Sequence, residues 1–254
     1  MYRDRCDTGC MFWCDSPRDV VRVAGPDAAG YLQSQVSQDL RPLAVGSAAW
    51  AFLLQPSGKI DVLLRVWRIA DDDYVLDTDG GFGDVMVARL NRFKIRVRAE
   101  ITPLFWRCIA VRGGVFEGLV AWGEGADLLG ADVEPPHGVR AGTPQELTDA
   151  RIAAGWPRMG EEIRPGELLP AETAVVAEAV SFTKGCYPGQ ELVERMDSRG
   201  AAAPRRVVVL PARAGDVAGA AVLLHGEAIG EITSVGTSQV LALLRRGFEA
   251  GARD

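Results

Sequence analysis

Apolar residues in the first hundred positions of the chain follow two periods, one typical of strands and one typical of helices. Short apolar runs rich in β-forming residues predict strands at 20–23, 50–54, 60–69 and 74–77. Helical spacing predicts a helix from Asp27 to Val36, with Leu32 and Val36 on its buried face, and a second helix from Val85 to Phe93. We therefore expect an α+β fold with mixed or antiparallel pairing.

A stripe of cations follows the second predicted helix. Between residues 93 and 99, apolar residues alternate with Arg92, Lys94, Arg96 and Arg98, which predicts a strand with one apolar and one cationic face. Such a face would suit a polyglutamate tail, a phosphate or an RNA segment. The alternative is a solvated sheet face, because charge runs usually lie on the surface.

The two ends of the chain differ from this central pattern. Residues 1–17 show little periodicity, and we expect an irregular segment there. Near the other end, short β-rich runs separated by turn residues predict strands at 206–210, 221–224, 229–234 and 240–244. This spacing is typical of a small barrel or sandwich.

Composition and charge narrow the class of protein. The chain has 254 residues, 48% of them hydrophobic, and a net charge of -6, which argues against general nucleic-acid binding. Its five cysteines are odd in number, so a secreted disulfide framework is not expected. No apolar run approaches membrane-spanning length and no signal-peptide pattern opens the chain. We expect a soluble, cytoplasmic protein.

Residues 182–200 hold the clearest candidate chemistry. Cys186 lies three residues before Gly189, where a short helix is expected to begin, and Lys184 lies two residues before the cysteine. A helix N-terminus and a nearby ammonium group both favour a thiolate. Glu191 and Arg195 are spaced to pair along the helix. The alternative is a buried, inert cysteine in a glycine turn.

The run KGCYPGQE at 184–191 resembles the K-G-C-[FY]-x-G-Q-E signature of the YgfZ family. Its aminomethyltransferase (T-protein) relatives carry K-G-x-[FY]-x-G-[QR]-E there, without the cysteine. The segments at 25–40, 51–68 and 151–163 are also similar to family elements, so the resemblance extends over residues 18–254. Of these segments, only the one at 182–200 would identify the family by itself.

This resemblance implies an aminomethyltransferase-like ring of three lobes around a central channel. Two α+β lobes would occupy residues 18–200, and a C-terminal β-barrel would occupy 201–254. A tetrahydrofolate, or a derivative of it, would bind in the channel. The family acts with folate in the assembly or repair of iron–sulfur enzymes, including those that thiolate transfer RNA, so such enzymes are the expected partners.

The resemblance also implies roles for particular residues. Cys186 and Lys184 match the functional cysteine and lysine of the family. The expected folate-binding residues are Tyr187, Gly189, Gln190, Glu191, Arg195 and Trp156. For Trp156 the functional interpretation is stacking on a flat ring, and core packing is an equal alternative.

Three positions depart from the aminomethyltransferase pattern. Val62 and Leu63 stand where those enzymes carry a carboxylate near the folate nitrogen, and an apolar side chain is neither acid nor base. Asp61 is adjacent, but one step along a strand turns it to the opposite face. Ala153 stands where those enzymes carry a glutamate that binds the pterin. Two alternatives therefore stay open: a true aminomethyltransferase, or a ligand-free interaction module of the same fold.

Cys6, Cys10 and Cys14 recur at every fourth position and would share one face of a helix. Thiolates on one face suit zinc or an iron–sulfur cluster. The family signature does not include them, and terminal segments are usually disordered, so we expect no metal site there.

Overall fold

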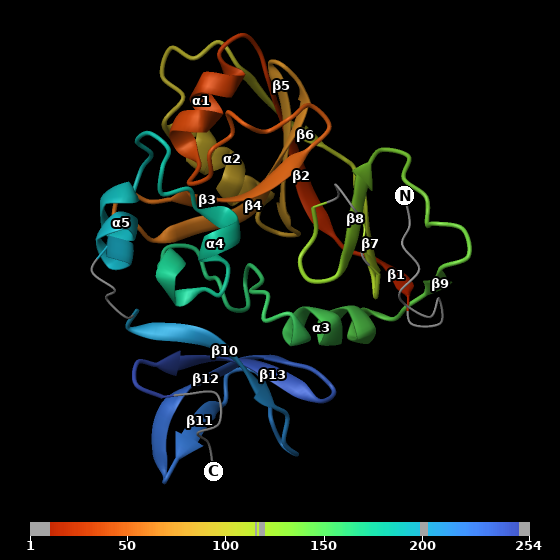
Figure 1. Cartoon of the computed structure of the whole chain (residues 1–254), viewed down its shortest axis with the longest axis vertical. Helices are drawn as coiled ribbons and strands as arrows, with labels where there is room; N and C mark the ends of the chain where they lie inside the picture. The colour runs from red at the N-terminus through yellow and green to blue at the C-terminus, as the bar shows by residue number, and fades with distance from the viewer. Residues whose placement is uncertain (1–10, 115, 117–119, 199–202, 249–254) are drawn as a thin grey trace.

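The computed structural model describes residues 11–114, 116, 120–198 and 203–248. Its strands form three sheets, and each sheet is the centre of one lobe in Figure 1. None of the helices in these residues is long and apolar enough to cross a membrane. The expected α+β class and three-lobed arrangement are confirmed.

The first lobe is a five-stranded antiparallel sheet with two helices. Its strands are β2 (Arg18–Ala24), β3 (Ala48–Leu54), β4 (Ile60–Ala70), β5 (Asp73–Asp79) and β6 (Glu100–Leu104), in the order β3-β4-β5-β2-β6. Helices α1 (Ala28–Gln35) and α2 (Gly83–Arg92) pack against it. The strands predicted at 20–23, 50–54, 60–69 and 74–77 and both predicted helices are thus found within a few residues of their expected bounds.

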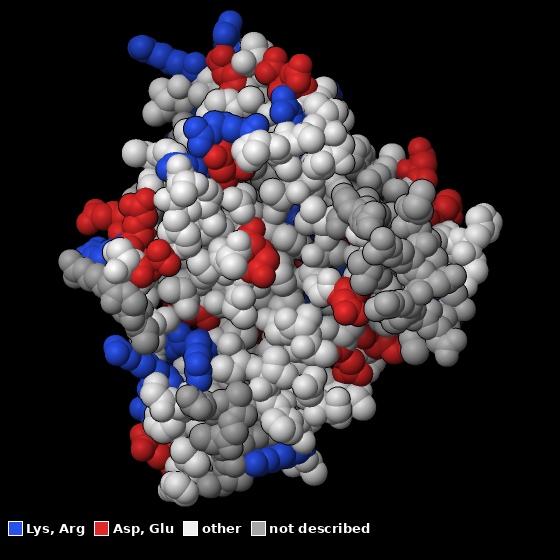
Figure 2. Space-filling view, in the orientation of Figure 1, with Lys and Arg blue, Asp and Glu red and all other residues white. Residues whose placement is uncertain are grey.

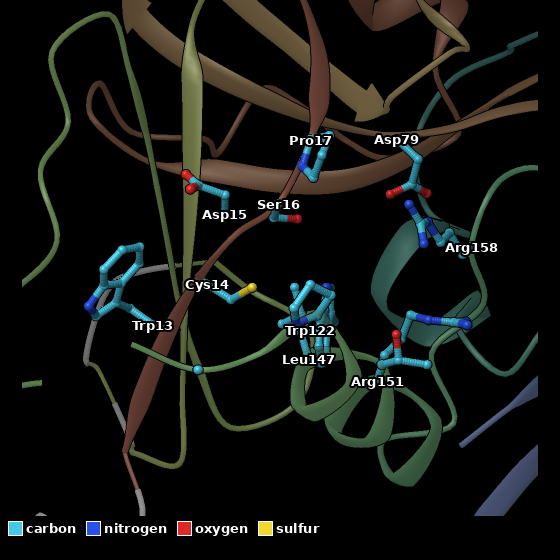
Figure 3. Close-up of a pocket in the computed structure, with 13 residues that line it drawn as sticks. Trp13, Cys14, Asp15, Ser16, Pro17, Asp79, Trp122, Leu147, Arg151 and Arg158 are labelled. Atoms are coloured by element: carbon cyan, nitrogen blue, oxygen red, sulfur yellow. The ribbon is translucent and has the colours of Figure 1, made fainter. Parts of the chain in front are cut away.

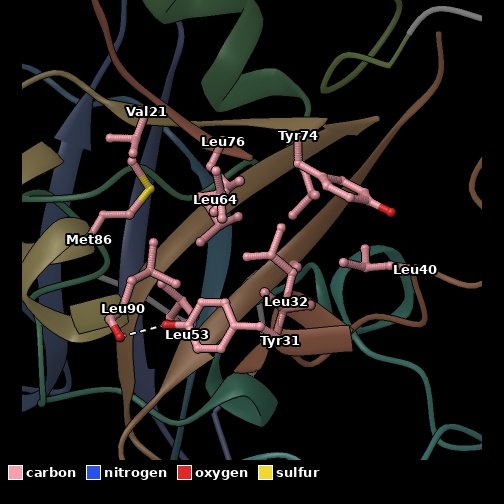
Figure 4. Close-up of a cluster of buried hydrophobic side chains, with 14 of the residues drawn as sticks. Val21, Tyr31, Leu32, Leu40, Leu53, Leu64, Tyr74, Leu76, Met86 and Leu90 are labelled. Atoms are coloured by element: carbon pink, nitrogen blue, oxygen red, sulfur yellow. Dashed lines mark hydrogen bonds between the residues drawn. The ribbon is translucent and has the colours of Figure 1, made fainter. Parts of the chain in front are cut away.

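The core of this lobe forms between the sheet and the two helices (Figure 4). Leu32 of α1 and Leu90 of α2 are fully buried with Leu64 of β4. Burying one such side chain contributes roughly 1.5–3 kcal/mol. The Tyr31 hydroxyl donates to the Leu90 carbonyl at 2.5 Å, which joins α1 to α2.

The second lobe contains the start of the described chain. Its sheet has the order β8-β7-β1-β9 and comprises β1 (Phe12–Asp15), β7 (Arg107–Arg112), β8 (Gly125–Gly130) and β9 (Arg140–Ala141). Helix α3 (Pro144–Ala153) follows β9 and begins with a capping box between Thr143 and Glu146. The expectation of an irregular segment up to residue 17 is therefore wrong for Phe12–Asp15. That strand exists because it pairs with β7, which lies far along the sequence.

The third lobe is a four-stranded antiparallel sheet. Its strands are β10 (Arg205–Pro211), β11 (Ala221–Leu224), β12 (Glu227–Val235) and β13 (Gln239–Arg245), and all four were predicted. Their order is β10-β13-β12-β11, so β10 and β11 are opposite edges and do not pair within the described residues. The expected closed barrel is an open sheet there, because strand periodicity predicts strands and not closure.

Short helical segments connect the second and third lobes. They are η1 (Pro170–Glu172), α4 (Val176–Ala179) and α5 (Gln190–Ser198). Helix α5 begins one residue after Gly189, as expected.

The predicted strand over residues 93–99 is wrong. Helix α2 ends at Arg92, the following residues form a loop, and β6 starts at Glu100. Arg96 has a φ of 56°, which interrupts any extended strand. Both the backbone N–H and the guanidinium of Arg98 donate hydrogen bonds to the carboxylate of Asp27. Of the alternating apolar residues, Ala99 is buried, Phe93 and Val97 are partly buried and Ile95 is exposed, and the expected cationic strand face does not form.

Candidate functional site

A cavity of about 600 Å³ lies between the first and second lobes, beside α3. Figure 3 shows β1 and the link to β2 on one side and α3 below. The apolar part of its wall comes from Trp13, Pro17, Trp122 and Leu147. The polar part includes Asp15, Ser16, Asp79, Thr148, Arg151 and Arg158. A cavity of this size with both apolar and polar walls suits a small-molecule site.

The Trp122 ring, an aromatic part of the wall, is held in place by Arg112. The guanidinium of Arg112 lies 3.7 Å from the centroid of the Trp122 ring, a close cation–π contact. Arg112 is buried and forms an ion pair with Asp127 at 2.8 Å. Trp122 therefore lines the cavity on a fixed support, which suits stacking against a planar ligand.

The polar part of the wall joins the end of β5 to the segment after α3. Asp79 Oδ1 accepts from Arg18 at 2.6 Å, and its Oδ2 accepts from the backbone of Met159 at 3.0 Å. Arg158 pairs with Glu161 at 3.2 Å and keeps 41% of its side chain exposed. Asp79 and Arg158 lie close to each other in Figure 3. One acceptor and one cation are thus available to a ligand at the same end of the cavity.

A second arginine of the wall ties the cavity to the third lobe. Arg151 donates to Glu162 at 2.9 Å and to the Ser234 hydroxyl at 2.7 Å. Glu162 is buried and also accepts from Thr233 of β12 at 2.7 Å. Because the charge of Arg151 is already neutralised, this residue mainly fixes α3 against β12.

A buried ionic network lies behind the cavity and joins the first two lobes. Arg65 of β4 pairs with Asp77 of β5 at 2.7 Å and with Asp127 of β8 at 2.5 Å. Burial opposes the charge of Asp77, but Arg65 and Arg18 hold the pKa of its carboxyl below its usual value. Burial likewise opposes the charge of Arg65, but its two carboxylate partners raise its pKa. These charges stay ionised and set the position of the two lobes.

Cys14 is the cysteine that the structure places in the cavity wall. It is buried in β1, and burial, followed by the charge of Asp15, raises the pKa of its thiol. Cys6 and Cys10 lie outside the described residues. Within the described part of the chain, no three His, Cys, Asp or Glu residues are grouped to hold a metal ion.

Cys186 and Lys184 occupy different surroundings. Cys186 is exposed on the link before α5 and is not part of the described wall of the cavity. Lys184 is buried, and burial lowers its pKa to about 8. Its ammonium group donates to three backbone carbonyls of the segment at 33–38. The structure thus places the two side chains in different surroundings, and the functional role of each stays a prediction.

The expected folate-binding residues also lie outside the described cavity wall. Tyr187 is buried, and burial raises its pKa to about 12. Trp156 is buried against Trp50, with 4.7 Å between the ring centroids, so the core-packing alternative applies to it. Gly189 has a φ of +84° and lies against the backbone of Gln55, which explains why a glycine is needed.

The remaining three predicted contacts belong to α5. The Gln190 amide donates to Glu194 at 2.5 Å, and Glu191 and Arg195 pair weakly at 3.7 Å on the surface. Both residues of that pair line a separate hollow beside Phe182. In Figure 2, acidic side chains gather at the left edge, where Figure 1 places α5.

Sequence reasoning missed the residues that build the cavity. Arg151 and Arg158 stand inside the segment at 151–163 that resembled the family, but the pattern did not assign them a role. Asp79 lies at the end of a predicted strand, where a polar residue is ordinary. Trp122 carried no spacing signal at all.

No protein-family model matches the chain. Among curated proteins, it is 29% identical over 268 residues to the human "Iron-sulfur cluster assembly factor IBA57, mitochondrial", covering 89% of this chain and 75% of that protein. It is 28% identical over 225 residues to the "tRNA-modifying protein YgfZ" of Klebsiella pneumoniae, covering 72% and 66%. An uncharacterised Haemophilus influenzae protein is 26% identical over 189 residues, covering 72% and 67%. The chain thus spans about two thirds of the latter two relatives.

A solved structure shares the fold. The glycine cleavage system aminomethyltransferase T from Bartonella henselae superposes with a TM-score of 0.72 at 17% identity, covering 92% of this chain and 78% of that one. At this identity the likeness concerns the fold alone. Together, the relatives and the fold confirm that this chain resembles the YgfZ family and is built like aminomethyltransferase T.

Proposed function

We propose that the chain is a folate-binding accessory protein that supports the assembly or repair of iron–sulfur enzymes, including enzymes that thiolate transfer RNA. The names of the two characterised relatives support the iron–sulfur and transfer-RNA parts of this proposal. The cavity between the first two lobes is the observation that carries the folate part.

The residues of the cavity fit a reduced folate. Its volume of about 600 Å³ lies within the range of small-molecule sites. Trp122 offers a flat face to a pterin or benzoyl ring, and Asp79 offers carboxylate oxygens to ring N–H donors. Arg158 is exposed enough to meet the carboxylates of a glutamate tail. When bound, the folate would supply one-carbon chemistry, while these side chains hold and orient it.

In this proposal Cys186 is the acting thiol and works at the surface. Its exposure makes it accessible to a partner protein, and the described cavity wall does not include it. The ligand and the thiol therefore act in separate places, and the client enzyme meets the thiol loop, residues 185–188, from outside.

The aminomethyltransferase alternative is disfavoured by the strand β4. Val62 is fully buried and Leu63 is 1% exposed, so neither side chain meets a ligand. The neighbouring Asp61 accepts from Gln55 at 2.8 Å and faces Arg89 at 3.6 Å, outside the described cavity wall. No carboxylate in these positions is free to move a proton on a folate in the cavity.

The ligand-free alternative is favoured by Ala153, which is exposed and takes no part in the described cavity wall. Calorimetric titration with tetrahydrofolate separates it from the proposal. We expect binding by the natural chain and about tenfold weaker binding by Arg158→Ala, which removes the tail contact. Arg164→Ala is the matched control, because Arg164 is also half-exposed and pairs with Glu231 away from the cavity. Absence of both heat and a thermal shift with the natural chain would favour the ligand-free module instead.

Complementation tests the thiol. Cys186→Ala should fold normally and fail to restore iron–sulfur enzyme activity in a strain that lacks this protein. Cys108→Ala is the control, because Cys108 is buried and plays no part in the proposal. Full complementation by Cys186→Ala would remove the thiol from the mechanism.

A further inference from the structure

The ammonium group of Lys184 lies in a cage of three backbone carbonyls at the end of α1. Nζ donates to the carbonyls of Gln33 at 2.6 Å, Val36 at 2.5 Å and Gln38 at 3.0 Å. Gln33 belongs to the last turn of α1, and Val36 is its C-cap. Carbonyls at a helix C-terminus lack intrahelical partners and carry partial negative charge. An ammonium group with three donors satisfies three of these carbonyls at once.

Further contacts join the same two segments. The backbone of Ser181 donates to Ser37 O at 3.0 Å, and the Ser37 hydroxyl donates to Ala179 O at 2.6 Å. The Gln38 amide donates to Glu178 O at 2.8 Å. Residues 178–184 are thus bound along residues 36–38, and Lys184 closes this contact at the end next to Cys186.

The other end of the thiol loop is held by close packing. Gly189 follows the loop, and a Cβ at this position would lie 2.5 Å from the backbone oxygen of Gln55 and 2.9 Å from Gly58 Cα. Gly58 in turn lies against Leu192 of α5. The segment at 185–188 therefore runs between two fixed points, with Gly185 and Cys186 exposed and Tyr187 buried.

We propose that Lys184 is a positioning residue: its ammonium group anchors the loop to the end of α1 and thereby sets the place of the Cys186 thiol on the surface. The inference rests on the proposed function only for the role of Cys186. The anchoring itself is a property of the folded chain and is tested separately. Lys184 is assigned no contact with a folate or a client.

Two charged side chains near the cage, Asp39 and Arg41, act on Lys184, but neither is its main partner. Asp39 and Arg41 act on the charge of Lys184 in opposite directions, and they pair with each other at 2.6 Å. The Tyr187 ring lies 5.2 Å from Nζ and adds a cation–π contact within the same loop. The carbonyls are therefore the principal partners of the ammonium group.

Nuclear magnetic resonance of the natural chain labelled with ¹⁵N-lysine tests the cage directly. The chain has three lysines, Lys59, Lys94 and Lys184, so each ammonium signal is assignable from Lys59→Met and Lys94→Met variants. We expect ammonium protons of Lys184 to exchange with water at least about tenfold more slowly than those of the other two. Equal exchange at all three lysines would overturn the anchoring.

Variants then test the link to the thiol. Lys184→Met should speed amide exchange in residues 33–38 and 181–188 by about tenfold and abolish complementation, while Lys184→Arg, which keeps a charged donor, should retain both properties within about threefold. Lys94→Met is the control for losing a lysine. Thr78→Ala is the control for lost stability, because it removes the buried bond from the Thr78 hydroxyl to Leu63 O and leaves both segments and the cage intact.

The outcomes separate the two proposals. If Lys184→Met loosens both segments but Cys186→Ala complements fully, the anchoring holds and the proposed function fails. If Lys184→Met leaves exchange in both segments unchanged, the positioning role is wrong whatever Cys186 does. If Thr78→Ala abolishes complementation as Lys184→Met does, the effect is general destabilisation and the positioning role is again wrong. If Lys184→Met does not fold, the ammonium exchange of the natural chain and the Lys184→Arg variant still decide.

Discussion

The cavity and the thiol loop are built on opposite physical principles. The wall of the cavity is fixed by buried ion pairs, in which Arg65, Asp77 and Asp127 join strands of two different lobes. In the thiol loop, Gly185 and Cys186 are exposed, Tyr187 is buried, and Lys184 and Gly189 fix the two ends. A binding site needs rigid walls that exclude water, whereas a thiol that meets a partner needs access.

This difference predicts different consequences of mutation in the two regions. Substitutions behind the cavity should change the stability of the whole chain, because they break buried pairs. Substitutions in the thiol loop should change the place or presence of the sulfur while leaving most of the free energy of unfolding intact. The following predictions proceed from the largest expected effect to the smallest.

Arg65→Met should lower the free energy of unfolding most. Removing the guanidinium leaves Asp77 and Asp127 buried without their shared partner, which typically costs about 3–5 kcal/mol. Urea unfolding measures the loss. Arg22→Ala is the matched control: it removes an exposed pair with Asp73 at 2.7 Å, and pairs in solvent contribute little to stability, so the loss should be much smaller. Similar losses in both variants would contradict the role of the buried network.

Gly189→Ala should have an intermediate effect. The new Cβ meets the backbone oxygen of Gln55 at 2.5 Å in a left-handed conformation, so we expect a cost of about 1–3 kcal/mol and a displaced start of α5. Thermal unfolding and amide exchange of α5 measure these changes. Gly185→Ala is the control, because a Cβ there meets open space. An unperturbed α5 in Gly189→Ala would show that this end of the loop is not fixed.

The pH dependence of stability should report the burial of Lys184. Burial lowers its pKa from 10.5 in the unfolded chain to about 8 in the folded protein, so unfolding takes up a proton between these pH values. The free energy of unfolding of the natural chain, relative to Lys184→Met, should therefore rise as pH increases from about 8 towards 10.5. A flat difference over this window would mean that the folded and unfolded pKa values are alike.

Cys186→Ala should change stability least, by about 0.5 kcal/mol or less, because the side chain is exposed. In the natural chain, the Cys186 thiol should react with iodoacetamide at least about tenfold faster than those of Cys14 and Cys108. Both of these are buried, and burial raises the pKa of Cys108 to about 11. Mass spectrometry of alkylated peptides gives the rates, and comparable rates for all three thiols would contradict the exposed loop.

The sequence predicted the thiol loop but not the cavity. The thiol loop was found because its residues are contiguous and resemble a specific signature. The strands of the first and third lobes were found because each carries its own periodicity. The cavity was missed because Trp122, Asp79 and Arg158 come from three separate segments, and none of them is unusual in its local context. The strand predicted from the cationic stripe was wrong for the converse reason. The local alternation is present, but Arg96 has a positive φ and Arg98 binds Asp27, so the backbone there is not an extended strand.

The amino-acid sequence by itself determined the class of fold, most of its strands and helices, and the kinship carried by residues 184–191, because these depend on local periodicity or on contiguous residues. Only the tertiary structure decided that Lys184 is buried while Cys186 is exposed, that Phe12–Asp15 joins the second lobe, and that the last sheet stays open in the described residues. Burial, strand pairing and cavity walls arise from contacts between residues far apart in the chain, and no local pattern encodes them.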